Sequence, residues 1–316
     1  MPNTVSRRGF LQTTGLALAA AGLPGQPADV PESSIALRVA HITDVHMLPE
    51  GLSVEGFTRA LRQIHAAWPK VDLIINGGDC IMDAMKADRQ WAEAQWRAFG
   101  KVMAAEVTLP IVHCIGNHDV WGWGVPANEA ADDPGSLAGK LLAMQSLGLV
   151  DRYYAFDRGG WHFIVLDSIH PELHSSEQHY TGMLDDEQRV WLTRDLDRTP
   201  AETPVCVVSH IPILCACEFL DGENEVSGDW VVPGAWMHID ARWLWQLFGQ
   251  HPNVRLCLSG HSHQVEDLRY HGVKYLTDGA ISANWWAGPY YDFPPGYVML
   301  TLHTDGASES RFVTYT

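Results

Sequence analysis

Short apolar runs alternate with amphipathic segments along most of the chain. The runs that are typical of buried strands occupy residues 38–42, 71–75, 111–115, 205–208 and 254–258, with later candidates at 273–277, 297–302 and 311–315. Helical spacing of apolar residues predicts helices over residues 53–67, 88–103, 185–196 and 238–248. Residues 153–157 and 161–166 flank Arg158-Gly159-Gly160, which predicts a hairpin. This alternation predicts one layered α/β domain.

Polar blocks tend to follow the apolar runs. The five blocks are Asp44-Val45-His46, Gly77-Gly78-Asp79, Gly116-Asn117-His118-Asp119, Ser209-His210 and Gly260-His261-Ser262-His263. Their carboxylate, amide and imidazole groups exceed what one metal ion needs and suit two ions that share a carboxylate. Open α/β sheets bind ligands at the C-terminal ends of their strands. The sequence therefore predicts a dinuclear metal site there.

Charge argues against one class of partner. The formal net charge is −17 and the isoelectric point is about 5.2, so general binding to a nucleic acid backbone is not expected. The 316 residues suit one large domain, which we place at residues 32–316.

Residues 1–31 read as a targeting segment and linker. Ser6-Arg7-Arg8-Gly9-Phe10-Leu11 precedes an apolar stretch at 15–23, and this order resembles a bacterial twin-arginine signal. The stretch is far shorter than the roughly 20 residues that span a bilayer. We expect export by the twin-arginine machinery to a periplasmic or extracellular location, without a stable membrane span. A disordered basic tail is the alternative.

The six cysteines do not look like a disulfide framework. Cys80, Cys114, Cys206 and Cys257 lie in or beside apolar runs, where free cysteine behaves as a small hydrophobe. Cys215-Ala216-Cys217 forms a C-x-C in a loop without a second pair at zinc-finger spacing, so a buried or free thiol is expected there rather than a structural zinc. A disulfide elsewhere stays open in an oxidising compartment.

The ordered blocks together resemble the calcineurin-like metallophosphoesterase superfamily over roughly residues 36–280. Their form is most similar to the cyclic-nucleotide and glycerophosphodiester phosphodiesterase branch. The resemblance implies a four-layer αββα sandwich with two metal ions at the C-terminal ends of the strands. It implies one ion on Asp44, His46, Asp79 and His263, and the other on Asp79, Asn117, His210 and His261. It further implies that His118 faces the substrate and assists the leaving group, with Asp119 orienting it.

The chemistry of such a site is hydrolysis of phosphate esters. Two ions about 3.5–4 Å apart activate a bridging water and bind the phosphoryl oxygens, while a nearby imidazole assists a poor leaving group. We expect small phosphodiesters as substrates, with a phosphomonoesterase that scavenges phosphate from nucleotides or sugar phosphates as the alternative. A catalytically silent metal-bearing binding protein is the alternative of another class. Mn, Fe and Zn all suit the ligands, and the oligomeric state stays open.

Aromatic residues crowd the loops that follow three of the blocks. The candidate substrate rim comprises Trp121, Trp123, Trp230, Trp236, Trp285, Trp286 and Tyr290. Such side chains stack on a base, a sugar or an aryl ester, but they also pack loops against one another. Acidic residues of the loop at 218–225 would disfavour polyanionic substrates on that side.

Overall fold

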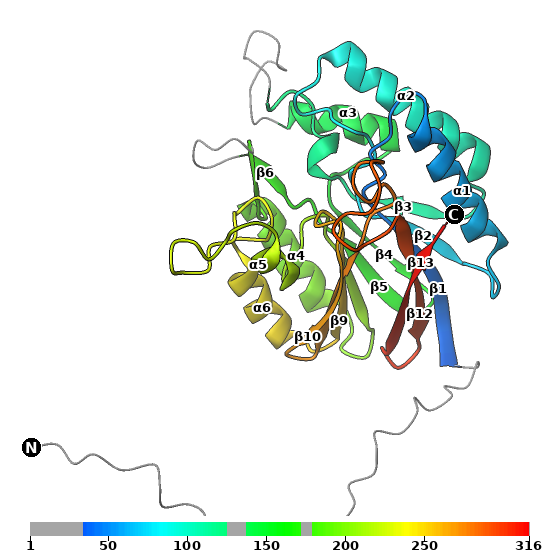
Figure 1. Ribbon diagram of the computed structural model, residues 1–316. Helices are drawn as coiled ribbons and strands as arrows, with labels where there is room; N and C mark the ends of the chain where they lie inside the picture. Colours follow the sequence, from blue (N-terminus) through cyan, green and yellow to red (C-terminus); the bar gives the residue numbers. More distant parts are fainter. Residues whose placement is uncertain (1–33, 125–136, 172–178, 316) are drawn as a thin grey trace, which may run out of the picture. The chain divides into compact units, whose positions relative to one another are not determined.

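Two mixed β-sheets face each other in the computed structural model, which describes residues 34–124, 137–171 and 179–315 (Figure 1). The first sheet has the order β13-β12-β1-β2-β3, with strands β1 (Ile35–Ile42), β2 (Leu73–Asn76), β3 (Ile111–His113), β12 (Gly296–His303) and β13 (Ser308–Thr314). The second has the order β10-β11-β9-β8-β5-β4, with strands β4 (Tyr154–Arg158), β5 (Trp161–Val165), β8 (Val205–Val208), β9 (Val254–Ser259), β10 (Val265–Tyr270) and β11 (Val273–Asp278).

The inner strands of both sheets run parallel. β1 pairs in parallel with β2, and β2 with β3; in the other sheet β5, β8, β9 and β11 form a parallel set. Hairpins form three of the four sheet edges, because β13, β4 and β10 pair antiparallel with β12, β5 and β11; the remaining edge strand, β3, pairs in parallel with β2. The parallel order brings the C-terminal ends of β1, β2 and β3 to one edge of their sheet, and those of β8 and β9 to one edge of the other.

Three hydrophobic cores separate four layers. Along β8, Cys206 and Val208 belong to the core between the sheets, whereas Val205 and Val207 belong to the core under the helices of the second sheet. This alternation with a period of two buries both faces of the strand and explains its continuous apolar sequence. The third core joins the outer face of the first sheet to its helices. The αββα sandwich implied by the sequence is confirmed.

Helices cover the outer face of each sheet (Figure 1). The first sheet carries α1 (Leu52–Ala66), α2 (Arg89–Glu106) and α3 (Ala138–Leu147), and the second carries α4 (Asp186–Arg198) and α6 (Ala241–Gln250). Asp88 and Asp185 begin α2 and α4 as N-caps, accepting backbone N–H bonds from Trp91 and Gln188. Short elements complete the fold: the ribbon β6 (Ile169–Pro171) with β7 (Tyr180–Gly182), the one-turn α5 (Cys217–Leu220) and a 3₁₀ turn, Asn117–Asp119.

The predicted elements agree with the structure to within a few residues at their ends. The hairpin forms between β4 and β5, with positive φ at Gly159 and Gly160 as a two-residue turn requires. β10 and α3 were not predicted. The expected targeting segment lies outside the described residues. Among the helices described here, none has the length and apolar character needed to traverse a bilayer.

Candidate metal centre

The structure brings the seven predicted ligands together where strands of both sheets end. Asp44 and His46 follow β1, Asp79 follows β2, and Asn117 follows β3. The second sheet contributes His210 after β8, and His261 and His263 after β9. Residues separated by more than two hundred positions thus meet in one buried cluster, as the motif order implied.

The first group of ligands consists of Asp44, His46 and His263. Each offers one atom within 4.8 Å of the others. His263 Nε2 lies 3.3 Å from Asp44 Oδ1 and 3.0 Å from His46 Nε2. His46 Nε2 is also 3.8 Å from Asp79 Oδ2, which connects this group to the next.

The second group consists of Asp79, His210 and His261, with Asn117 beside it. His210 Nε2 lies 3.3 Å from Asp79 Oδ2 and 3.0 Å from the amide oxygen of Asn117. Asp79 therefore contacts both groups. This is the position that a carboxylate shared by two ions must occupy.

Carbonyl oxygens fix the orientation of two of the imidazoles. Nδ1 of His210 donates to Gly77 O at 2.9 Å, and Nδ1 of His263 donates to Ala283 O. Both rings consequently present Nε2 to the ligand groups. Metal-binding histidines are oriented by outer hydrogen bonds of this kind.

The donor set fits cations. Asp44 Oδ1 is buried without a hydrogen bond and points toward the imidazoles of His46 and His263. An unpartnered buried carboxylate oxygen is costly unless a cation meets it. The residues present therefore fit metal ions, with one set of candidate ligands in each group.

Electrostatics prepare the ligands in their binding forms. Burial works to raise the pKa of Asp44 and Asp79, but His263 and His210 respectively hold the two carboxyls below their usual range. Burial lowers the pKa of His261 to about 3 and that of His46 well below its usual value. Burial opposes the shift at His210, but the Asp79 carboxylate raises its pKa to about 9. The two carboxylates and the imidazoles of His46 and His261 thus have their lone pairs free for metal.

Five of the ligands adopt left-handed backbone conformations. The φ values are 54° for Asp44, 46° for His46, 51° for Asp79, 69° for His261 and 57° for His263. Non-glycine residues reach this region at a cost, although Asp and His tolerate it better than most. Each turn redirects a side chain at a strand end inward, toward the shared site.

Two glycines of the blocks are required by close packing. A Cβ at Gly116 would lie 2.1 Å from Asp79 Oδ1, and one at Gly260 would lie 2.3 Å from Asp44 Oδ2. Any side chain there would displace a ligand carboxylate. The glycines preceding Asn117 and His261 therefore make room for the metal ligands.

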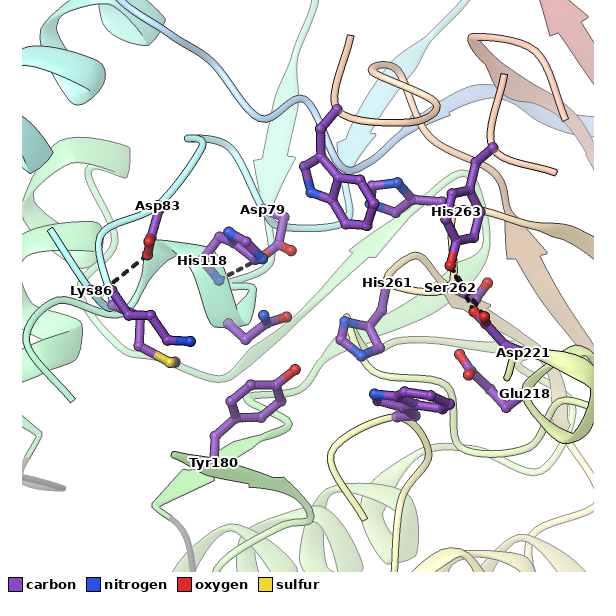
Figure 2. A pocket seen from close by; sticks show the side chains of 15 residues that line it. Asp79, Asp83, Lys86, His118, Tyr180, Glu218, Asp221, His261, Ser262 and His263 are labelled. Carbon is purple, nitrogen blue, oxygen red and sulfur yellow. Dashed lines mark hydrogen bonds between the residues drawn. The ribbon is translucent and has the colours of Figure 1, made fainter. Parts of the chain in front are cut away.

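His118 lines a cavity of about 320 Å³ above the ligands, together with Asp79, Asn117, His261 and His263 (Figure 2). Its backbone N–H donates to Asp79 Oδ1 at 2.8 Å, and its Nδ1 donates to the carbonyl of Met82. Because Nδ1 of His118 faces the Met82 carbonyl, Nε2 of the same ring points away from that carbonyl. This position suits a group that acts on a substrate bound in the cavity.

The expected role of Asp119 is not what the structure shows. Its Oδ1 accepts from the N–H of Cys80 at 2.8 Å, and its Oδ2 accepts from the N–H of Gly116 at 2.9 Å. It therefore connects the turns after β2 and β3, while Met82 O contacts the His118 ring. Asp119 is a structural support for the ligand turns, because its two oxygens are used by backbone donors.

Five residues of the predicted aromatic rim divide into two sets, one at the cavity and one in the core. Trp236, Trp285 and Tyr290 line the cavity, and the Trp285 ring lies 4.5 Å from that of His263. Trp121 and Trp123 are instead buried in the core between the first sheet and its helices. This corrects their assignment to the rim.

Two further tryptophans lie away from the cavity wall. Trp286 donates from Nε1 to the carbonyls of Val45 and His46, and its ring fills the space left open by Gly56 of α1. It therefore supports the ligand turn from behind. Trp230 is exposed and contacts Phe219 edge to face. Neither belongs to the lining of the cavity.

The cavity also contains residues that the sequence did not single out. Lys86 and Tyr180 line it, and neither carries a motif that could have marked it. Asp221 accepts hydrogen bonds from the hydroxyls of Tyr290 and Tyr291 and from Gln264. Asp221 thereby joins the loop after His210 to the loop after β11. Its acidic neighbourhood was visible in the sequence, but this contact was not.

Comparison with protein families gives a direct assignment. The family model for calcineurin-like phosphoesterases matches residues 37–265, which include all seven ligands. The chain belongs to the calcineurin-like phosphoesterase family. It is a metallophosphoesterase, a hydrolase of phosphoric esters.

Curated relatives share this family at modest identity. A 3',5'-cyclic-nucleotide phosphodiesterase, alr5338 of Nostoc sp., is 24% identical over 289 residues, covering 85% of this chain and 89% of the relative. The 3',5'-cyclic adenosine monophosphate phosphodiesterase CpdA of Escherichia coli K12 is 24% identical over 284 residues, covering 85% and 86%. The similarity thus extends over nearly the whole length of both relatives.

Solved structures with low sequence identity share the fold. A dimetal phosphatase from Danio rerio, LOC 393393, has a TM-score of 0.59 at 16% identity and covers 89% of this chain and 100% of that one. The purple acid phosphatase PPD1 of yellow lupin, Lupinus luteus, has a TM-score of 0.53 at 15% identity, covering 87% and 51%. At these identities the likeness concerns the arrangement of sheets and helices.

Proposed function

We propose that this metallophosphoesterase hydrolyses small phosphodiesters. The observation that carries the proposal is the placement of the shared Asp79 carboxylate and the His118 imidazole on one cavity that also carries Trp285 and Tyr290. The names of the curated relatives, which are cyclic-nucleotide phosphodiesterases, agree with a diester substrate.

The charge of the cavity wall favours a diester over a monoester. Asp83, Glu218 and Asp221 line the cavity, and Lys86 is the one lysine or arginine among its described lining residues. A phosphodiester brings a single negative charge, whereas a phosphomonoester brings nearly two at neutral pH. An acidic wall repels the second charge, so the diester enters at lower cost.

The chain's own residues have defined tasks in this reaction. The two candidate ligand groups would hold metal ions, whose chemistry there would be activation of a water and neutralisation of the phosphoryl oxygens. His118 Nε2 delivers a proton to the departing ester oxygen, while its Nδ1–H stays bonded to Met82 O. Asp79 positions His118 by accepting its backbone N–H, and Trp285 and Tyr290 exclude water along one side of the substrate.

A comparison of esters tests the proposal. The protein is stripped of metal with a chelator, then reloaded with Mn, Fe or Zn with measured metal content. We expect kcat/KM for bis-p-nitrophenyl phosphate and 3',5'-cyclic AMP to exceed that for p-nitrophenyl phosphate. A preference for the monoester would replace the proposal with a phosphomonoesterase. No turnover of any ester by fully loaded protein would favour a binding protein.

We further propose export by the twin-arginine route. The support is the order of Arg7-Arg8 and a short apolar stretch at residues 15–23. Substitution of both arginines by lysine is expected to retain the protein in the cytoplasmic fraction of a bacterial host. Unchanged fractionation of that variant would contradict the proposal.

A further inference from the structure

Two thiols and a carboxylate meet beside the cavity, outside the dinuclear centre. Cys215 and Cys217 lie on the segment after His210, and Glu266 belongs to β10, shortly after His263. One ligand atom from each of the three lies within 4.8 Å of the other two. Ester hydrolysis at the dinuclear centre uses none of these three groups.

The carboxylate is fixed by the segment that carries the thiols. Glu266 Oε2 accepts hydrogen bonds from the backbone N–H of Ala216 at 2.7 Å and of Cys217 at 3.4 Å. The C-x-C segment therefore wraps around the Glu266 side chain. This contact arranges two sulfur atoms and a carboxylate before any ligand arrives, which lowers the ordering cost of binding.

The two thiols interact directly. A hydrogen bond from the Cys215 thiol lowers the pKa of Cys217, and the same bond raises the pKa of Cys215. Hydroxyls of Ser262 and Thr277 also lower the pKa of Cys217. A thiolate is the form of cysteine that ligates metal, so Cys217 is prepared for that role.

Buried polar groups surround the thiols. The Thr277 hydroxyl, in a residue only 2% exposed, lies beside the sulfur of Cys217. Glu218 is likewise 2% exposed, and it lines the cavity. The thiols therefore lie in a buried, polar environment.

Acidic side chains gather near the thiols. The side chains of Asp221 and Glu266 lie near the Glu218 carboxyl group. No ion pair joins Glu218, Asp221 or Glu266 to a described lysine, arginine or histidine. Figure 2 shows Glu218 and Asp221 at one end of the cavity and Lys86 at the other. A bound cation would offset this concentration of negative charge.

We propose that Cys215, Cys217 and Glu266 bind one Zn²⁺ ion in a site separate from the dinuclear centre. Zinc accepts thiolate and carboxylate ligands together and is bound by four ligands in structural sites. With three protein ligands, a water molecule would occupy the fourth position. The thiol protons leave to solvent as the sulfur atoms ligate the ion. The proposal adds a bound metal to the free thiols that the sequence predicts and the structure shows at Cys215 and Cys217.

The proposed zinc has a structural consequence for the cavity. It would join the loop after His210 to β10, and that loop carries Glu218 and Asp221 of the cavity wall. The ion therefore fixes the acidic end of the cavity without contacting the phosphoryl group. This role is independent of which ester the enzyme hydrolyses.

Cobalt substitution of the full-length protein tests the proposal. The ligands of the dinuclear centre are nitrogen and oxygen atoms, so a thiolate-to-cobalt charge-transfer band in the near ultraviolet reports only on a cysteine site. We expect the band in reduced wild-type protein, its loss in Cys217→Ala and its weakening in Glu266→Gln. Zinc-loaded Cys217→Ala is expected to contain one metal equivalent fewer than wild type.

Two controls separate this site from the rest of the molecule. Cys257→Ala removes a buried thiol of β9 outside the cluster and is expected to keep the band. Asp79→Asn disturbs the dinuclear centre and is also expected to keep it. The proposal is overturned if reduced wild-type protein shows no band, or if Cys217→Ala retains it. It is equally overturned if Cys215 and Cys217 form a disulfide whose reduction does not permit uptake of the third metal.

Discussion

The ligand cluster and the aromatic loops of this protein differ in how well their residue types indicate their location. All seven ligands, from five separate blocks, meet in one buried site. The seven aromatic residues of the neighbouring loops do not, since three line the cavity and two lie in the core. A buried carboxylate or imidazole needs a partner, whereas a tryptophan is equally stable in a core or on a cavity wall. In this protein, the polar residues at strand ends therefore indicate their location in the fold better than the aromatic residues of the loops do.

The largest effect is expected for Asp79→Asn, which tests the shared ligand. The substitution removes a charge that both groups use, so metal content should fall below two ions per chain. We expect kcat/KM to fall more than about 100-fold, beyond the usual cost of losing an outer hydrogen bond to a ligand. Metal analysis and steady-state kinetics measure both quantities.

A matched control for Asp79→Asn is Asp83→Asn. Asp83 lines the same cavity but belongs to neither ligand group. We expect it to keep two ions per chain. If Asp79→Asn keeps both ions and full rate, Asp79 is not the shared ligand.

The second effect concerns His118, which lies on the cavity but outside the implied ligand set. His118→Ala is expected to lower kcat by about 10²–10⁴-fold, the usual contribution of acid catalysis, while metal content stays near two. The loss should be larger for an alkyl ester than for a p-nitrophenyl ester, because p-nitrophenolate needs less protonation. Equal losses for both esters, or loss of metal, would assign His118 a different role.

The third effect separates the two sets of tryptophans. Trp121 is 8% exposed, its Nε1 donates to Ala87 O, and Arg89 lies over its ring, so Trp121→Ala should lower the free energy of unfolding by about 3–5 kcal/mol. Trp285 is 39% exposed beside His263, so Trp285→Ala should raise KM and cost less stability. Chemical denaturation and kinetics of both variants measure the difference. A higher KM with little loss of stability in Trp121→Ala would instead indicate that Trp121 contacts the substrate.

The smallest expected effect is a pH dependence of the free energy of unfolding, which comes from His162, a residue outside the cavity lining. Hydrogen bonds to Asp195 raise the pKa of His162 from 6.5, and Asp157 adds to the shift. A raised histidine pKa stabilises the fold at low pH, and the contribution is lost as pH rises through the folded-state pKa, above 6.5. His162→Gln should therefore cost more unfolding free energy at about pH 5 than at about pH 9. A cost that grows with pH would contradict this assignment.

Sequence patterns predicted the fold well where side chains have one favourable environment. Strands such as β8, buried on both faces, read as continuous apolar runs. β10 was missed because Glu266, Asp267 and Arg269 give this edge strand a polar sequence. α3 was missed because its apolar residues are spread around the helix, with Lys140 buried by an ion pair to Asp167. That pairing depends on residues distant in sequence.

The residues of the candidate site could be predicted from the sequence, but much of their geometry could not. The spacing of the blocks placed the ligands at strand ends, but the left-handed turns at Asp44, His46 and Asp79 depend on tertiary contacts. The predicted role of Asp119 was wrong for a similar reason. Its neighbour His118 is adjacent in sequence, whereas its hydrogen-bond donors lie on Cys80 and Gly116. Sequence adjacency therefore gave the wrong partner.

The placement of the ligands has a consequence for how long the protein survives. Asp44 and His46 come from one sheet and His263 from the other, and Asp79 and His210 are divided in the same way. An ion bound by either group would fasten the two halves of the sandwich, so by mass action free metal would raise the stability of the folded state. In a cell short of metal, the enzyme would lose its resistance to unfolding and proteolysis together with its activity.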